Sequence, residues 1–105
     1  MDKRAIIKII DYLKKELRRN GVKISGIALF GSQLSNSIGD KNDIDLIIIS
    51  DEFKNKNIFK RGDITMEAEL STLRKFMIPM DVLKMTREEF NVATRNKRYN
   101  AQLIV

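Results

Sequence analysis

The sequence predicts an α/β (α+β) fold in which a small sheet of three to four strands is flanked by helices. Amphipathic patterns typical of helices alternate along the chain with short apolar runs typical of strands. These runs place apolar side chains on both faces, as in strands that are covered on both sides. The length of 105 residues fits a single domain, residues 1–105, with one core.

Composition narrows the classes of protein. A hydrophobic share of 43% and a charged share of 32% favour a globular domain. No apolar run approaches the roughly 20 residues that span a bilayer, and no signal peptide is evident, so we expect a cytoplasmic protein without a membrane partner. Because the chain has no cysteine and no histidine, any metal must bind oxygen ligands, which indicates Mg²⁺ or Mn²⁺. The net charge of +6 favours anionic partners and leaves nucleic acid open.

Residues 2–20 predict the first helix. Asp2 is a suitable N-cap, and Asn20 and Gly21 form a suitable C-terminal stop. The apolar residues recur at three- and four-residue spacing and form one stripe: Ile6, Ile9, Ile10, Leu13 and Leu17.

Residues 22–30 predict the first strand, which Gly31 and Ser32 interrupt. Residues 32–37 fit one or two helical turns, and residues 38–42 a polar loop.

Residues 43–50 predict a central strand. Alternation places Asp43, Asp45, Ile47 and Ile49 on one face, and it places the other isoleucines and Leu46 on the opposite face.

The next segment, residues 51–62, is rich in Lys and Asn and predicts a polar surface loop. Residues 63–76 predict a helix whose core-facing stripe is Met66, Leu70, Leu73 and Phe76 or Met77.

Pro79 ends that helix and leads into a third strand over residues 80–85, in which Asp81 shares a face with Leu83 and Met85. Thr86 and Glu89 have the spacing of a capping box and predict a last helix over residues 87–96. The tail, residues 97–105, fits an edge strand or a partner contact, and the pattern does not decide between them.

The acidic residues suggest a functional site. Asp43 and Asp45 lie on one face of a strand, where their like charges need a nearby cation, either a metal ion or a basic side chain. Gly31 lets the backbone turn sharply and approach a phosphate closely, and Ser32 lies at a helix start where free N–H groups can bind phosphate oxygens.

The spacing of these residues resembles a known family. Gly31 and Ser32, ten residues, then Asp43-Ile44-Asp45 and a later Asp81 are similar to the minimal nucleotidyltransferase (MNT) family of the DNA polymerase β-like nucleotidyltransferase superfamily. The resemblance implies a mixed sheet, with Asp43, Asp45 and Asp81 as catalytic and metal-binding residues. It also implies two Mg²⁺ ions, with Mn²⁺ as a substitute, and nucleotide binding by Gly31 and Ser32. Asp81 would complete the second metal site or take the proton of the acceptor hydroxyl.

One position departs from the family pattern. Many members follow Gly-Ser with arginines, whereas residues 33–36 here contain none. The cation that holds the triphosphate must come from elsewhere, and the alternatives are Lys41, Lys54 and Arg61.

The resemblance also implies a reaction and a partner. The reaction is transfer of AMP from ATP to a hydroxyl of a partner protein, and the partner is a HEPN-domain toxin for which this chain is the antitoxin. Because the chain has no room for an acceptor domain, the acceptor comes from another molecule or from a second subunit, so a homo-oligomer stays open. The alternatives are a catalytically weak or inactive binding module that neutralises its partner by complex formation, and a nucleotidyltransferase directed at RNA.

Overall fold

The computed structural model describes residues 2–30, 43–96 and 101–105. In these residues the elements follow the order α1 (Lys3–Arg19), β1 (Gly26–Phe30), β2 (Ile44–Ile49), the short 3₁₀ helix η2 (Asp51–Phe53), α2 (Ile58–Phe76), β3 (Met80–Met85), α3 (Arg87–Arg95) and β4 (Ala101–Leu103). No helix in the described part of the chain is both long and apolar enough to cross a membrane.

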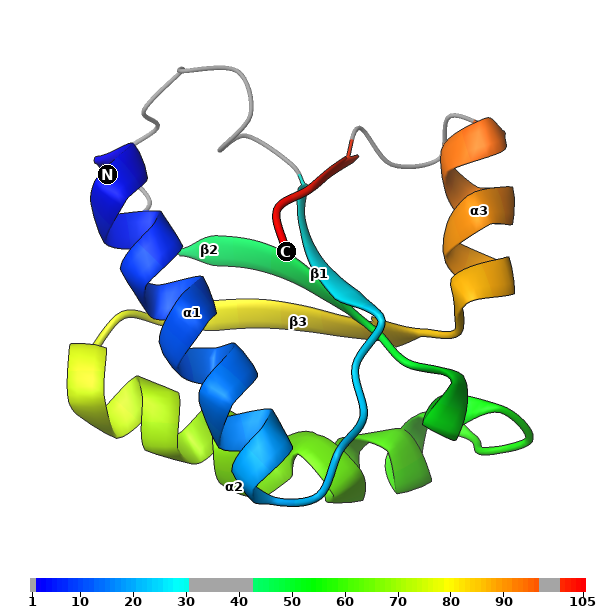
Figure 1. The fold of residues 1–105 in the computed structure, drawn as a ribbon, viewed down its shortest axis with the longest axis horizontal. Helices are drawn as coiled ribbons and strands as arrows, with labels where there is room; N and C mark the ends of the chain where they lie inside the picture. The colour runs from blue at the N-terminus through cyan, green and yellow to red at the C-terminus, as the bar shows by residue number, and fades with distance from the viewer. Residues whose placement is uncertain (1, 31–42, 97–100) are drawn as a thin grey trace.

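The strands form a mixed sheet in the order β3-β2-β1-β4 (Figure 1). β2 is parallel to β3 and antiparallel to β1, and β1 is antiparallel to β4. The predicted α/β class is therefore confirmed, and β2 is central as expected. The tail, which the pattern left undecided, forms an edge strand over Ala101–Leu103.

Helix α1 begins and ends where its capping residues predict. The Asp2 side chain accepts a hydrogen bond from the N–H of Arg4, and Asn20 is the C-cap. All members of the predicted stripe are buried, namely Ile6, Ile9, Ile10, Leu13 and Leu17. This confirms that α1 covers the sheet, and Figure 1 shows it crossing in front of the strands.

The two faces of the sheet have separate cores. One face packs Ile44, Leu46 and Ile48 of β2 against α1 and Ala68 of α2. The other face packs Ile47 and Ile49 of β2 with Ala28 of β1 and Phe90 of α3, and Leu83 and Met85 of β3 join them. Alternation along β2 and β3 is thus confirmed, and it assigns Asp45 and Asp81 to the face that α3 covers.

The surface loop predicted for residues 51–62 is wrong. The Ser50 side chain accepts a hydrogen bond from the N–H of Glu52 and starts η2, in which Phe53 is fully buried. Asn57 caps α2 in the same way through the N–H of Lys60, so this helix begins at Ile58 rather than at residue 63. Because residues 51–62 are mostly polar, their composition alone did not indicate that Ser50 and Asn57 each cap the start of a helix.

The predicted core stripe of α2 is also wrong. The buried residues of this helix are Thr65, Ala68 and Thr72, which are small enough to let α2 approach α1 closely. The Tyr12 hydroxyl of α1 pairs with the Ser71 hydroxyl at 2.8 Å, and the rings of Tyr12 and Phe76 meet edge to face. The stripe residues Met66, Leu70, Leu73 and Met77 are all exposed, and only Phe76 packs against the core.

The starts of β1 and α3 can also be compared with the predicted ones. β1 begins at Gly26 rather than at residue 22, because the preceding segment bonds outside the strand ladder: the Lys23 N–H donates to the Glu52 carboxylate. α3 begins after Thr86, whose side chain accepts from the Glu89 N–H while the Glu89 carboxylate accepts from the Thr86 N–H. The predicted capping box is confirmed.

Candidate active site

The strand register places residues from all four strands in one row at one end of the sheet. Asp45 of β2 is the direct neighbour of Asp81 in β3. Phe30 of β1 pairs with Ala101 of β4, and it lies one position beyond the last β1–β2 pair, Leu29 with Leu46, next to Asp45. Register partners point to the same side of a sheet, so Asp45 and Asp81 point to one face, about 4.8 Å apart at the backbone.

This end of the face is open in the described part of the chain. Phe90 of α3 packs against Ile47 and Ile49, which lie farther along β2. Asp81 is exposed and Asp45 is partly exposed, whereas Ile47 is fully buried. Asp81 is therefore accessible from solvent, and Asp45 is accessible in part.

Of the three other predicted site residues, the structure describes Asp43 and does not describe Gly31 and Ser32. Asp43 directly precedes β2 and is exposed, at the same end of the sheet as Asp45. Gly31 and Ser32 follow Phe30 in the sequence and lie outside the described residues, as does Lys41. β1 therefore ends beside Asp45 at the point where the Gly-Ser pair begins.

The donor set fits a hard cation only in part. Carboxylate oxygens are the ligands that Mg²⁺ prefers, and two of the predicted ligands are in register on one open face. No group of three or more acidic side chains in residues 2–30, 43–96 and 101–105 is arranged to hold a metal ion. The register thus brings Asp45 and Asp81 side by side, and Asp43 does not join them in such a group within the described residues.

Arg61 is unsuited to the triphosphate role proposed as one alternative. Its guanidinium pairs with both carboxylate oxygens of Glu89, at 2.7 and 3.1 Å, and also donates to the carbonyls of Lys84 and Lys56. The Arg61 side chain is only 14% exposed. The Arg61 hydrogen bonds, and those that Glu89 accepts from Thr86, hold the pKa of Glu89 below its usual value despite partial burial. Arg61 therefore joins α2, β3 and α3.

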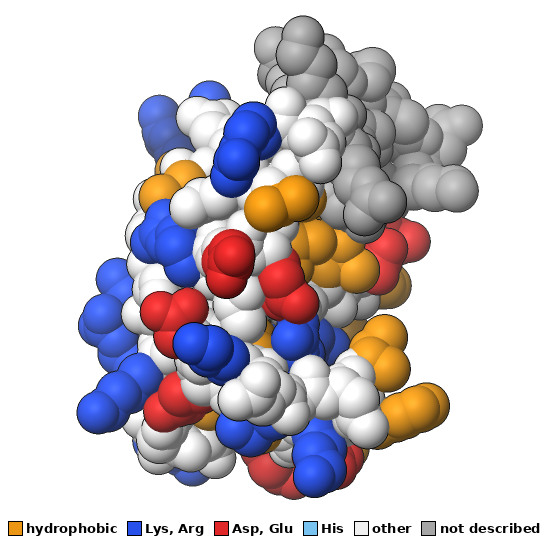
Figure 2. All heavy atoms as spheres, turned by 90° about the vertical axis from the view of Figure 1, so that its right-hand side faces the viewer, with side chains coloured by type: hydrophobic (Ala, Val, Ile, Leu, Met, Phe, Trp, Pro, Cys, Tyr) orange, Lys and Arg blue, Asp and Glu red, His pale blue; other side chains and the backbone are white. Residues whose placement is uncertain are grey.

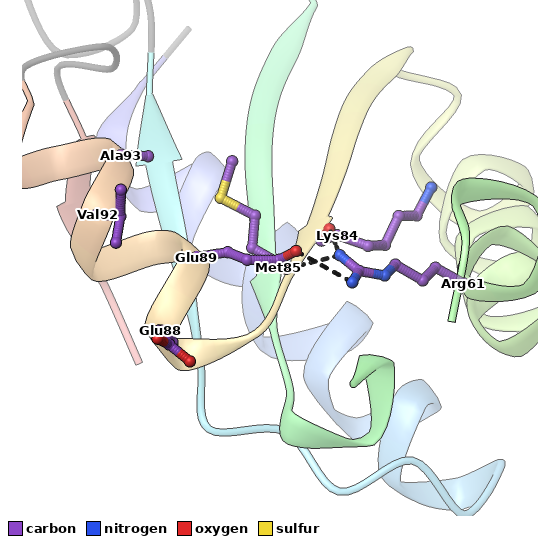
Figure 3. Close-up of a pocket in the computed structure, with 7 residues that line it drawn as sticks. All are labelled: Arg61, Lys84, Met85, Glu88, Glu89, Val92 and Ala93. Atoms are coloured by element: carbon purple, nitrogen blue, oxygen red, sulfur yellow. Dashed lines mark hydrogen bonds and ion pairs between the residues drawn. The ribbon is translucent and has the colours of Figure 1, made fainter. Parts of the chain in front are cut away.

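This ion pair borders a pocket of about 470 Å³ between β3 and α3. Figure 3 shows Arg61 reaching across the end of β3 to Glu89, with Met85 of β3 and with Val92 and Ala93 of α3 also lining the pocket. Met85 is four residues beyond Asp81 in β3, which corresponds to about 13 Å along the strand. The pocket is therefore separate from Asp45 and Asp81, which together are called the acidic row.

Lys54 lies at that far end too. It is the C-cap of η2, which follows the carboxyl end of β2, whereas Asp45 is near the start of the same strand. Neither Lys54 nor Arg61 is beside the acidic row. The remaining alternative, Lys41, lies outside the described residues.

The positive charge is not concentrated on the side of the molecule that carries α3. Figure 2 shows Lys and Arg side chains interleaved with Asp and Glu there, with apolar side chains between them. Among the described residues visible in this view, no uninterrupted basic patch marks a nucleic-acid surface.

Comparisons with known proteins identify a family and similar folds. The family model of polymerase β nucleotidyltransferases matches residues 8–105. A candidate nucleotidyltransferase from Sulfolobus solfataricus is similar in structure, with a TM-score of 0.58 and 19% identity over 98% of this chain and 87% of that protein. A second candidate nucleotidyltransferase has a TM-score of 0.55 and 23% identity over 90% of this chain and 96% of its own.

The arrangement of elements is also shared outside these two proteins. BolA1 from Arabidopsis thaliana has a TM-score of 0.51 at 15% identity, over 77% of this chain and 94% of its own. No protein in the curated set matches the sequence. At such identities the structural similarities establish the fold, and the family model identifies the group to which the sequence is related.

Proposed function

The chain belongs to the polymerase β nucleotidyltransferase family, and from this premise we propose that it transfers AMP from ATP to a hydroxyl group of a partner protein. The observation that carries the proposal is the register of Asp45 and Asp81 on adjacent parallel strands, where Asp81 is exposed and Asp45 is partly exposed. Two carboxylates on one face suit such a reaction because they could hold a divalent cation that offsets the negative charge of the phosphate oxygens.

The residues have distinct roles in this proposal. Asp45 and Asp43 would hold Mg²⁺, and Asp81 would complete the site or accept the proton of the attacking hydroxyl. When bound, the metal supplies Lewis-acid stabilisation of charge on the phosphate oxygens. The acceptor oxygen bonds to the α-phosphorus, the bond between the α-phosphorus and the bridging oxygen breaks, and pyrophosphate leaves. Gly31 and Ser32 are proposed to bind the triphosphate.

The biological setting that we propose is a toxin–antitoxin pair of the HEPN/MNT type, within the minimal nucleotidyltransferase branch. The partner would be a HEPN-domain toxin that adenylylation silences, in the cytoplasm.

The position of the radiolabel tests the proposal directly. The chain is incubated with Mg²⁺ and a candidate HEPN-domain partner protein, using ATP labelled at either the α- or the γ-phosphate. We expect the partner to be labelled from α-labelled ATP only, together with release of pyrophosphate. Label from the γ-phosphate would indicate a kinase, and no label from any NTP would contradict the catalytic proposal.

A binding module is the second candidate, and two observations favour it. Within the described residues no three acidic side chains converge, and residues 33–36 contain no arginine. A chain that only covers its partner needs neither feature. The double variant Asp43→Asn, Asp45→Asn would then neutralise the partner as well as the unchanged chain does, without any label transfer.

A further inference from the structure

The outer side of α2 carries an apolar stripe that no described residue covers. Its members Phe59, Met66, Leu70, Leu73 and Met77 are 79%, 50%, 39%, 38% and 76% exposed. The four members within α2 have spacings of seven, four and three residues, which are those of the a and d positions of a coiled coil, so they line one side of the helix. Met77 follows them directly as the C-cap of α2, with a φ of 55°. Figure 1 shows α2 along the lower rim of the molecule, where the end of α1 passes in front of it.

We propose that this stripe pairs with the same stripe of a second copy of the chain, antiparallel, in a two-fold symmetric dimer. The stripe is symmetric about Ala68: Met66 and Leu70 lie two residues to either side, and Phe59 and Met77 lie nine residues to either side. A two-fold axis at the level of Ala68 therefore places Met66 opposite Leu70, and Phe59 opposite Met77, of the other copy. Phe59 meets Met77, a favourable contact between sulfur and an aromatic ring.

Charge supports the antiparallel direction. Asp63 occupies an a position of the stripe, five residues before Ala68, so it lies opposite Leu73 and beside Arg74 of the second copy. Both Asp63 and Arg74 are exposed, and neither belongs to an ion pair with another described residue. The dimer would pair them twice, once on each side of the axis, whereas a parallel arrangement places Asp63 beside its own counterpart.

The stripe is small for a stable interface. It extends over about 27 Å of helix, and its residues are fewer than the 20 to 30 per partner of a standard interface. We therefore expect a dimer that dissociates on dilution. The stripe belongs to α2, which packs against the face of the sheet opposite to Asp45 and Asp81, so pairing leaves the acidic row accessible.

Sedimentation equilibrium of the full chain, without nucleotide, tests the proposal over micromolar to millimolar concentrations. Leu70→Glu buries a charge at the centre of the proposed interface and should weaken the dimer at least about tenfold. Val92→Glu is the matched control, because Val92 is 42% exposed and lies on α3; its dimer should be unchanged. Far-UV circular dichroism confirms that both variants fold.

A charge swap distinguishes this interface from non-specific hydrophobic association. Asp63→Arg and Arg74→Asp should each weaken the dimer because like charges then meet, and the double variant should restore it. Glu67→Gln should strengthen the dimer, because Glu67 precedes Ala68 and faces its own counterpart near the axis. These three results need no catalytic activity, so they stay separate from the fate of the proposed function.

A chain that stays monomeric at the highest concentration would overturn the proposal. So would a dimer that Leu70→Glu and Val92→Glu weaken equally, or one that the double charge swap does not restore. In a monomeric chain the stripe would instead be a docking site for a helix of a different protein.

Discussion

Asp45 and Asp81 are register partners on two adjacent parallel strands, although 36 positions separate them in the sequence. The α2 crossover that joins β2 to β3 brings them together, as expected of parallel strands. Their side chains emerge on one face, at the end of the sheet where β1 also finishes. This pair is the geometric basis for the proposed transfer reaction.

Neutralising either carboxylate should abolish transfer. Asp45→Asn and Asp81→Asn keep the side-chain size but remove a negative charge from the row. We expect the rate of pyrophosphate release to fall at least about 100-fold in each, as for loss of a group that acts on a proton or a metal. The assay uses labelled ATP and the partner protein under saturating Mg²⁺.

Asp11→Asn is the matched control for these variants. Asp11 lies on the exposed side of α1, where it forms a surface ion pair with Lys15 at 3.1 Å. Surface pairs of this kind contribute little to stability, so this variant should keep full activity. If Asp11→Asn lost as much activity as Asp45→Asn, the proposed catalytic role of Asp45 and Asp81 would be contradicted.

Mg²⁺ together with ATP should raise the melting temperature of the unchanged chain, and EDTA should reverse the rise. A ligand that binds only the folded state stabilises it by about 2.7 kcal/mol at 100 times its dissociation constant. In Asp45→Asn the shift should be much smaller, because one of the proposed ligands is missing. An equal shift in both proteins, measured by differential scanning calorimetry, would place the cation elsewhere.

Local sequence patterns were sufficient for most of the fold. The α1 stripe, the alternation in β2 and the Thr86 capping box are each signals within about one turn or one strand, and all three are confirmed. The α2 stripe failed because its apolar periodicity is real but faces outward. Contact with α1 requires small residues, and Thr65, Ala68 and Thr72 meet that requirement without an apolar signature.

Local sequence patterns were also insufficient to predict the whole candidate site. The pattern could identify Asp45 and Asp81 as unusual residues in apolar strands, and only the sheet order shows that the two strands are neighbours. Arg61 was an equally reasonable cation for a phosphate on sequence grounds. Its bond to Glu89 joins residues 28 positions apart, and no local pattern predicts such a pair.

Acid should weaken the fold through Glu89. Its pKa is lower in the folded chain than in the unfolded chain, chiefly because of the Arg61 hydrogen bonds. A lowered folded pKa contributes stability that is present above the unfolded value, about 4.3, and is lost as the pH falls through the folded value. Because the side chain is 47% exposed, solvent screens the pair and the effect should be modest.

The measurement compares urea unfolding of the unchanged chain and Glu89→Gln at several pH values. Glu89→Gln should be less stable at neutral pH, and the difference should shrink as the pH falls below about 4.3. Glu88→Gln is the control, since Glu88 lies in the same first turn of α3 and is exposed. A difference between Glu89→Gln and the unchanged chain that stays constant with pH would exclude the ion pair as its source.

Two glycines should respond to alanine in opposite directions. A Cβ on Gly26 would lie 2.6 Å from the Val105 carbonyl oxygen and 2.8 Å from a methyl group of Leu103, and the backbone there is held by bonds between Ile27 and Val105. Gly26→Ala must therefore displace the segment that follows β4, at a cost of about 1–3 kcal/mol in the free energy of unfolding.

Gly62 lies within α2, and a Cβ there meets nothing within 4 Å. Gly62→Ala should stabilise the chain by about 0.5–1 kcal/mol, because alanine favours the helix. Urea unfolding measures both, and equal effects of the two substitutions would mean that the segment after β4 does not pack against Gly26.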